Sequence, residues 1–439
     1  MRPFGNETVH LETLADPAFV SATRERGLSR LLVAHVSTGL FFMVFPGTLI
    51  GVWNLFSITG ARSAEAAYAA WVQAHGHAQI FGWIGSFILG IGFYSIPKLR
   101  RLRWFPLSAG WTCWILWTLG VLLRWAAGFW TWNWRLLLPF SAAMELGAFL
   151  LFFRSISGYH AQQKSRGFEI WVGAVIAGTI GLLATLVLNF GASLQLALAG
   201  ESPVFPHAFD QRFLVVATWG FVVPFVWGFS SRWMPTFLGL RPQRGALVLV
   251  SVGLNAAGVI SALAGWFPAS SLCLLAGAAV SVIALRLWET GVRPPKVQGI
   301  HQSFPVFVRL AYAWLVVAAL LGVYAAASGG PGIWGASRHA LTVGFLATMV
   351  FSVGSRVLPA FSGMKPLFSP RLMFAYLALL NFGCTLRVPT EALAYQENTS
   401  LAWSWLPVSA LIELSAVVLF AINLVVSFAQ DPIVPLRGA

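Results

Sequence analysis

The sequence contains few charged residues. Asp, Glu, Lys and Arg make up only 10% of its 439 residues, whereas hydrophobic residues make up 58%. Together with a mean hydropathy of +0.75, this composition excludes an ordinary soluble domain, which carries about 25% charged residues. The repeated apolar runs of about 20 residues predict an all-α protein that crosses a lipid bilayer many times.

Cysteine is also scarce. The three cysteines, Cys113, Cys273 and Cys384, lie in separate apolar runs, and the sequence has no CxxCH motif. The lack of that motif excludes a covalently attached c-type haem, and the spacing indicates neither a disulfide framework nor a cysteine metal site. We interpret all three cysteines as residues that pack in the core.

Acidic residues are half as numerous as basic ones, 14 against 28, which gives a formal net charge of +14. The basic residues are spread over short loops between the apolar runs, so this charge does not predict a nucleic-acid partner. If the N-terminus lies in the cytoplasm, 22 basic residues fall on the cytoplasmic side and 6 on the outer side. This is the positive-inside pattern. It predicts a bacterial inner-membrane protein with both termini in the cytoplasm.

The apolar runs predict twelve membrane-spanning helices. They form one membrane domain over residues 28–428, between a polar cytoplasmic segment 1–27 and a cytoplasmic tail 429–439. The first segment has no apolar core and does not resemble a cleaved signal peptide. The expected spans are residues 28–56, 68–97, 105–127, 134–154, 168–198, 210–234, 245–265, 269–289, 304–327, 337–359, 370–388 and 402–428.

The second and tenth spans resemble each other. One reads HAQIFGWIGSFILGIGFYSIP from His77, and the other reads HALTVGFLATMVFSVGSRVLP from His339. Each has a proline twenty residues after its histidine. The sixth span ends in the similar SSRWMP, and Val215 occupies the position of the histidine.

The fourth, eighth and twelfth spans form a second matched set. They begin with PFSAAMELG, PASSLCLLAG and PVSALIELS, and Leu274 stands where the others carry Glu145 and Glu413. Two matched triplets predict a unit of four helices repeated three times. We therefore expect a ring of twelve helices, built as three four-helix pseudo-repeats around a pseudo-threefold axis.

Three histidines are the main candidates for a functional site. His75, His77 and His339 lie in the outer half of the membrane, where ionisable side chains are costly. Neutral imidazoles on facing helices can ligate a b-type haem without covalent attachment. His75 and His77 are about 200° apart around a helix and point to nearly opposite sides. The repeat favours His77 with His339, which leaves His75 for a second haem, a copper ion or a hydrogen bond; ordinary interhelical hydrogen bonds are the alternative for all three.

Other polar residues could support such a site. Arg338 and Arg212 are placed to pair with haem propionates, because guanidinium groups bind carboxylates with two parallel hydrogen bonds. Arg338 could equally anchor its helix at the interface. His207 could reach a metal near the outer surface, and Glu145 and Glu413 could handle protons or bond between helices. We expect structural or solvated roles for the remaining histidines, His10, His35, His160 and His301.

The chain resembles the NnrS family of bacterial membrane proteins. The resemblance rests on HGHAQIFGW from His75, SRWMPTF from Ser231 and RHALTVGFLATMVFSVGSRVLPAFSG from Arg338. It spans residues 28–428. It implies a link to the cellular response to nitric oxide, with haem and copper as cofactors.

The twelve-helix plan is also similar to subunit I of the haem–copper oxidases, in which an HG pair like His75–Gly76 carries a haem ligand. Those oxidases also need a histidine in the sixth span and a histidine pair in the seventh. This sequence has neither, and Ser337 stands two residues before His339. The sequence therefore does not predict oxygen reduction at a haem–copper centre.

These observations lead to a functional hypothesis. We expect an inner-membrane protein with at least one b-type haem, which senses, binds or removes nitric oxide and exchanges electrons with a quinol or cytochrome donor. Two alternatives stay open at this point. One is an oxidase-like electron-transfer subunit of a larger respiratory complex, and the other is a secondary transporter, since twelve helices with internal repeats suit one.

Overall fold

The computed structural model describes residues 17–99, 106–130, 133–157, 169–395 and 400–432, and within these ranges it contains helices, turns and loops but no strand. Twelve helices in the described ranges are long and apolar enough to cross a membrane, which confirms the predicted fold class and number of spans. His10 and His160 lie outside the described residues. The predicted boundaries at 27/28 and 428/429 stay predictions.

Some spans consist of several consecutive helical segments. The first span contains α1 Pro17–Phe42, η2 Met43–Leu49 and α2 Ile50–Ala61, and the short η3 Ala64–Ala66 follows it. The second, sixth and tenth spans are α3 Ala69–His77, η4 Ala78–Gly85 and α4 Ser86–Leu99; α8 His207–Val215, η5 Val216–Val222 and α9 Val223–Leu238; and α13 Pro331–His339, η6 Ala340–Ala347 and α14 Thr348–Phe361.

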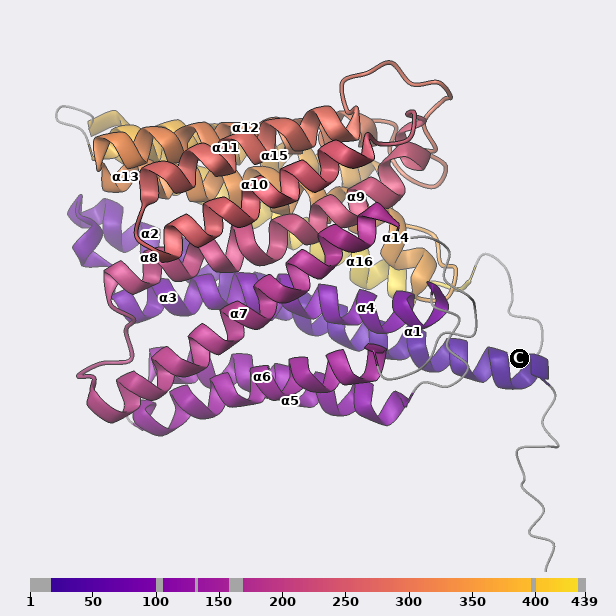
Figure 1. The fold of residues 1–439 in the computed structure, drawn as a ribbon, viewed down its shortest axis with the longest axis horizontal. Helices are drawn as coiled ribbons and strands as arrows, with labels where there is room; N and C mark the ends of the chain where they lie inside the picture. The colour runs from indigo at the N-terminus through magenta and orange to yellow at the C-terminus, as the bar shows by residue number, and fades with distance from the viewer. Residues whose placement is uncertain (1–16, 100–105, 131–132, 158–168, 396–399, 433–439) are drawn as a thin grey trace, which may run out of the picture.

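The other spans are single α-helices. They are α5 Leu107–Phe129, α6 Trp134–Ser157, α7 Ile170–Ala199, α10 Gly245–Leu263, α11 Phe267–Leu285, α12 Phe304–Ser328, α15 Pro370–Ala394 and α16 Ser400–Ala429. Figure 1 shows the helices side by side along the horizontal axis, with α5 and α6 at the lower edge and α11 and α12 at the upper edge. Two spans end earlier than predicted. α10 ends at Leu263 rather than 265, and α11 ends at Leu285 rather than 289, because Arg286 takes a left-handed conformation with φ 57°.

The second, sixth and tenth spans form the centre of the bundle. In the 18-residue stretch that represents each span, 83%, 78% and 72% of the residues of these three spans are buried. The corresponding share is 28–50% in the other nine spans of the described residues. Aromatic contacts join the three central spans to one another. These contacts are Phe81 with Phe213, Trp83 with Phe351 and Trp233 with Phe361. The outer helices turn more of their apolar side chains outward, as expected of a surface that faces lipid.

Each central span is interrupted by a π-helical segment at the same register. The segments η4, η5 and η6 begin directly after His77, Val215 and His339, the three positions that the sequence repeat matches. π-Helical segments are rare and occur frequently at functional sites. Their common position supports the repeat, although the threefold superposition itself stays a prediction.

Neighbouring helices bind the backbone of two of these segments. The π-helical register shifts hydrogen bonding from i→i+4 to i→i+5, so a carbonyl needs another donor. Trp117 Nε1 in α5 donates to Phe81 O at 3.0 Å, and Asn255 Nδ2 in α10 donates to Trp219 O at 2.7 Å. Phe81 and Trp219 each lie four residues after the matched position, so the same carbonyl is capped in both units.

A packing contact also recurs in all three units. A glycine of the third helix lies against one side chain of the fourth helix, so close that a Cβ atom on it would come within 2.7, 2.7 and 2.8 Å of that side chain. The pairs are Gly120 with Glu145, Gly258 with Leu274, and Gly383 with Glu413. The facing residues are the ones that the second sequence triplet matches.

Candidate functional site

The three candidate histidines lie where short helices meet the π-helical segments. His75 and His77 are in the last turn of α3, and His339 is the last residue of α13. Both helices lie towards the left-hand end of the bundle in Figure 1.

His77 points into the first four-helix unit. Its Nε2 donates to Oε1 of Glu145 at 2.7 Å, and Oε2 of Glu145 accepts from Asn189 Nδ2 at 3.3 Å. The imidazole stacks on Phe81 with ring centroids 4.4 Å apart. His77 is 7% exposed and Glu145 is fully buried, so this is an internal hydrogen-bonded pair.

Arg124 adds a buried charge to this cluster. The side chain is only 2% exposed, and its guanidinium lies over the ring of Phe205 at 5.0 Å. It interacts electrostatically with Glu145 and Asp210, whereas its Nε and Nη1 have no hydrogen-bond partner among the described residues. Arg124 lies inside the span Leu107–Phe129, as the predicted span 105–127 implies.

His75 points to the other side of α3, towards the first span. Its Nδ1 donates to Gly47 O of η2 at 2.8 Å. The ring lies close to the backbone of Gly51, where a Cβ atom would come within 2.6 Å of His75 Cε1. His75 also interacts electrostatically with His339 and Arg387 of the third four-helix unit.

His339 is held by acidic and basic groups of α15. Its Nδ1 lies 2.8 Å from Oε2 of Glu391 and 3.0 Å from Gly335 O. Arg387 Nε donates to the same Glu391 oxygen at 3.1 Å, and Arg387 Nη2 lies 3.4 Å from His339 Nε2. Oε1 of Glu413 is buried nearby without a hydrogen-bond partner among the described residues, and Glu413 interacts electrostatically with Arg387 and His339.

The contacts of the two α3 histidines differ. His77 bonds to Glu145 of α6, whereas His75 bonds to η2 and interacts electrostatically with His339. The two rings, about 200° apart around the helix, therefore have different neighbours. The pairing of His77 with His339 stays a prediction.

His75 and His339 share one chemical feature. The Nδ1 of each donates to a backbone carbonyl, and that of His339 also to a carboxylate. Such bonds fix the tautomer that keeps the lone pair on Nε2, as metal-ligating histidines need. His77 differs, because its Nε2 bonds to the Glu145 carboxylate, whereas the Nε2 of His339 accepts from Arg387 Nη2 at 3.4 Å.

The two arginines expected near a propionate have partners within the protein. Arg338 donates to Gln211 and interacts electrostatically with Asp210 of α8 and Glu391 of α15. Arg212 Nη1 donates to Leu263 O at 3.4 Å, at the end of α10. Arg387 is the guanidinium beside His339 instead. The sequence carried a signal for it, since Arg387 and Glu391 are four residues apart on one helix face.

The remaining histidines do not join a shared metal centre. His207 is exposed and bonds to Gln211 at 3.0 Å, and His35 is buried in α1 with Nδ1 3.0 Å from Leu31 O. Within the ranges that the structure describes, no group of three or more His, Cys, Asp or Glu side chains could hold a metal ion. The site therefore offers histidine pairs rather than a compact metal cluster.

Comparison with known proteins agrees with the architecture. A family model described as NnrS protein matches residues 37–430. A cryo-electron microscopy structure of a haem–copper terminal oxidase dimer is similar, with a TM-score of 0.64 and 10% sequence identity over 93% of this chain and 85% of that chain. At this identity the likeness shows the fold alone. A search of curated protein sequences found no match.

Proposed function

Because the chain belongs to the NnrS protein family, we propose that it is a membrane haem protein that acts in the binding or removal of nitric oxide. The b-type haem would be held without covalent attachment, between His75 of α3 and His339 of α13. When bound, haem iron supplies a redox centre and a position for small gaseous ligands. The residues around the two histidines do the rest.

One observation carries this proposal. Two imidazoles on two of the three central spans both have Nδ1 bonded to oxygen acceptors and Nε2 free of any carboxylate. Two neutral histidines on facing helices are a common axial ligand set for a b-type haem. The donor chemistry therefore fits the group.

Arg387 and Glu391 would support the two ligands in different ways. Glu391 holds the Nδ1 of His339, which orients the ring and increases the basicity of Nε2. Arg387 is buried to 8% exposure and lies within 3.4 Å of His339. It would pair with a haem propionate, the role first expected of Arg338.

The two histidines are not held equally firmly. His339 Nδ1 has a carboxylate and a carbonyl as partners, whereas His75 Nδ1 has one carbonyl. We therefore expect His75 to be the imidazole that yields its position to nitric oxide. Electron transfer from a quinol or cytochrome donor would use the same centre. For copper, the described residues supply no cluster of three ligands, so the proposal is limited to haem.

The test is a haem assay on purified full-length variants. His75→Ala and His339→Ala should each lose most of the haem, measured by pyridine haemochrome absorbance per protein, or change it from six-coordinate to five-coordinate spectra. His77→Ala and His35→Ala are the matched controls. Each removes a buried histidine that does not belong to the proposed pair, His77 from α3 and His35 from α1. Both controls should keep the parental spectrum.

Three outcomes would contradict the proposal. Loss of haem in His77→Ala but not in His75→Ala would restore the pairing that the repeat favours. Normal haem content in all four variants would exclude histidine ligation by these residues. A colourless parental protein with no Soret band would exclude the haem and favour the transporter alternative. Addition of nitric oxide to the reduced parental protein should shift the Soret band, and His75→Ala should respond faster.

A further inference from the structure

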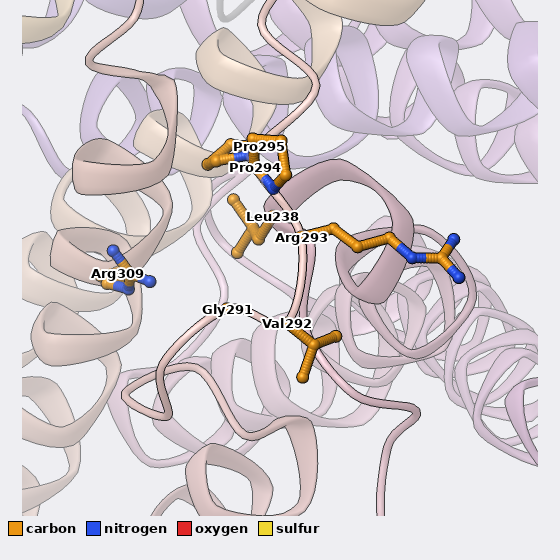
Figure 2. Close-up of a pocket in the computed structure, with 7 residues that line it drawn as sticks. All are labelled: Leu238, Gly291, Val292, Arg293, Pro294, Pro295 and Arg309. Atoms are coloured by element: carbon orange, nitrogen blue, oxygen red, sulfur yellow. The ribbon is translucent and has the colours of Figure 1, made fainter.

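The end of the bundle opposite the histidines carries a basic pocket. It is a cavity of about 460 Å³ between the end of α9, the start of α12 and the loop that joins α11 to α12. Figure 2 shows Arg309 on one side and the loop with Pro294 and Pro295 on the other. The basic bias predicts that this end of the bundle faces the cytoplasm.

The loop that forms the pocket is fixed in place by hydrogen bonds to α9. Val292 N and Arg293 N donate to Gly239 O at 2.8 and 3.2 Å, and Lys296 N donates to Phe237 O at 2.9 Å. Gly239 has φ 67°, and a Cβ atom there would lie 2.1 Å from Arg293 O. Glycine is therefore required at this contact. The pocket is preformed rather than assembled on binding.

The charge around the pocket is strongly positive. Arg293 and Arg309 line the pocket. Between positions 235 and 310 the sequence has six basic residues, Arg241, Arg244, Arg286, Arg293, Lys296 and Arg309, whereas Glu289 is the only acidic one. Glu289 is already paired with Arg244 at 3.0 Å and Arg286 at 2.8 Å. The two arginines that line the pocket form no ion pair with any described residue, so their charge is available to a ligand.

Arg309 lies near the start of α12. It is five residues into α12, about 7.5 Å from the helix start at 1.5 Å per residue. Its Nε donates to Leu287 O at 2.7 Å, which directs the guanidinium towards the loop. Arg293 is exposed on the loop, and in Figure 2 its side chain extends away from Arg309.

The surroundings of the pocket are apolar and exposed. Trp288 is 55% exposed, Val292 55% and Val306 59%. Tryptophan is typical of the membrane–water interface, and exposed valine on a span faces acyl chains. A ligand here would therefore place an anionic group beside Arg309, with Arg293 adding positive charge at the rim, and apolar chains beside Val292 and Val306.

We propose that this pocket binds the phosphate headgroup of an anionic phospholipid, such as phosphatidylglycerol, from the adjacent leaflet. Basic pockets between membrane helices on the cytoplasmic side bind such headgroups. The exposed apolar rim favours a lipid over a soluble phosphate, because a soluble anion would gain nothing from it. This site is independent of the haem proposal.

The test is native mass spectrometry of the full-length protein in detergent, titrated with phosphatidylglycerol or phosphatidylcholine. The protein should bind phosphatidylglycerol more tightly. Arg293→Gln should weaken that binding about fivefold, and Arg293→Gln with Arg309→Gln about 25-fold, at about fivefold for each charge. Arg371→Gln is the matched control, since Arg371 is exposed at the start of α15 on the same predicted side but outside the pocket.

Specific results would overturn the proposal. Equal binding of the two lipids would exclude an anion site, and an equal loss in Arg371→Gln would reduce it to general surface attraction. Displacement of phosphatidylglycerol by millimolar inorganic phosphate would assign the pocket to soluble anions instead. If the double variant fails to fold, the exposed Arg293→Gln decides the question alone, and unchanged binding in that variant refutes the lipid site.

Discussion

Replacement of Glu145 by leucine tests the buried charge cluster of the first four-helix unit. Leucine fits this position sterically, because Leu274 already packs against Gly258 in the second unit as Glu145 packs against Gly120. The change removes the partner of the buried Arg124 and the acceptor for His77 and Asn189. The protein should therefore lose electrostatic energy and two hydrogen bonds without a steric clash.

The size of this loss can be worked from the contacts. A buried charge that loses its partner costs about 3–5 kcal/mol, and we take about 3 kcal/mol since Asp210 still interacts with Arg124. Two buried donors without an acceptor add about 1 kcal/mol each. Glu145→Leu should thus lower the free energy of unfolding by about 5 kcal/mol. Adding Arg124→Leu removes the buried charge that Glu145→Leu leaves without its partner. The free energy of unfolding of the double variant should therefore be only about 2 kcal/mol below that of the parental protein.

The assay is reversible unfolding in mixed detergent micelles, with Arg124→Leu alone to complete the double-mutant cycle. The double variant should be about 3 kcal/mol more stable than Glu145→Leu. A double variant that is no more stable than Glu145→Leu would refute the reasoning, because it would show that Arg124 carries no unpaired charge in the single variant. The second unit serves as the natural precedent, since it has Leu274 and, four residues after Gly258, Ala262.

Further predictions concern packing, pH and topology. Gly181→Ala should lower the melting temperature, because its Cβ would lie 1.9 Å from Gly220 O; Gly191→Ala, in the same helix with open space around it, should not. A hydrogen bond from Arg286 lowers the pKa of Glu289 below its ordinary value of 4.5. The ion pair of Glu289 with Arg286 should therefore be fully present above pH 4.5 and weaken as the pH falls through the lowered pKa. Hydrogen exchange of the loop against pH measures this, and Glu289→Gln should give faster exchange already at neutral pH. Reporter fusions should read cytoplasmic in the α11–α12 loop and periplasmic in the α7–α8 loop, and the opposite pattern would overturn the orientation.

The number of spans and the overall fold follow from the sequence because a bilayer leaves few options. Every backbone group in the hydrocarbon must be bonded within its own segment, so each apolar run of sufficient length becomes a helix. Helix ends were less predictable. The ends of α11 and α9, for example, are set by the left-handed residues Arg286 and Gly239, and neither is marked by a loss of hydropathy alone.

The site was only partly predictable. The sequence identified the three histidines, and the helical period correctly placed His75 and His77 on opposite sides. It could not give the partners of each ring, Gly47 for His75 and Glu145 for His77, because these depend on the rotation of α3 within the bundle. Arg387 and Glu391 were missed for a related reason: in the sequence they lie near the end of a span, and only the packing of α15 against α13 brings them to the imidazole.

The π-helical segments bear on how the three units arose. A π-helical turn holds about one residue more than an α-helical turn, so each segment accommodates an extra residue without displacing the remainder of the helix. Three separate insertions at the same register in the second, sixth and tenth spans would be a coincidence. A single insertion in an ancestral four-helix unit, copied by two duplications, would place η4, η5 and η6 at one register, which is the outcome that the predicted repeat requires.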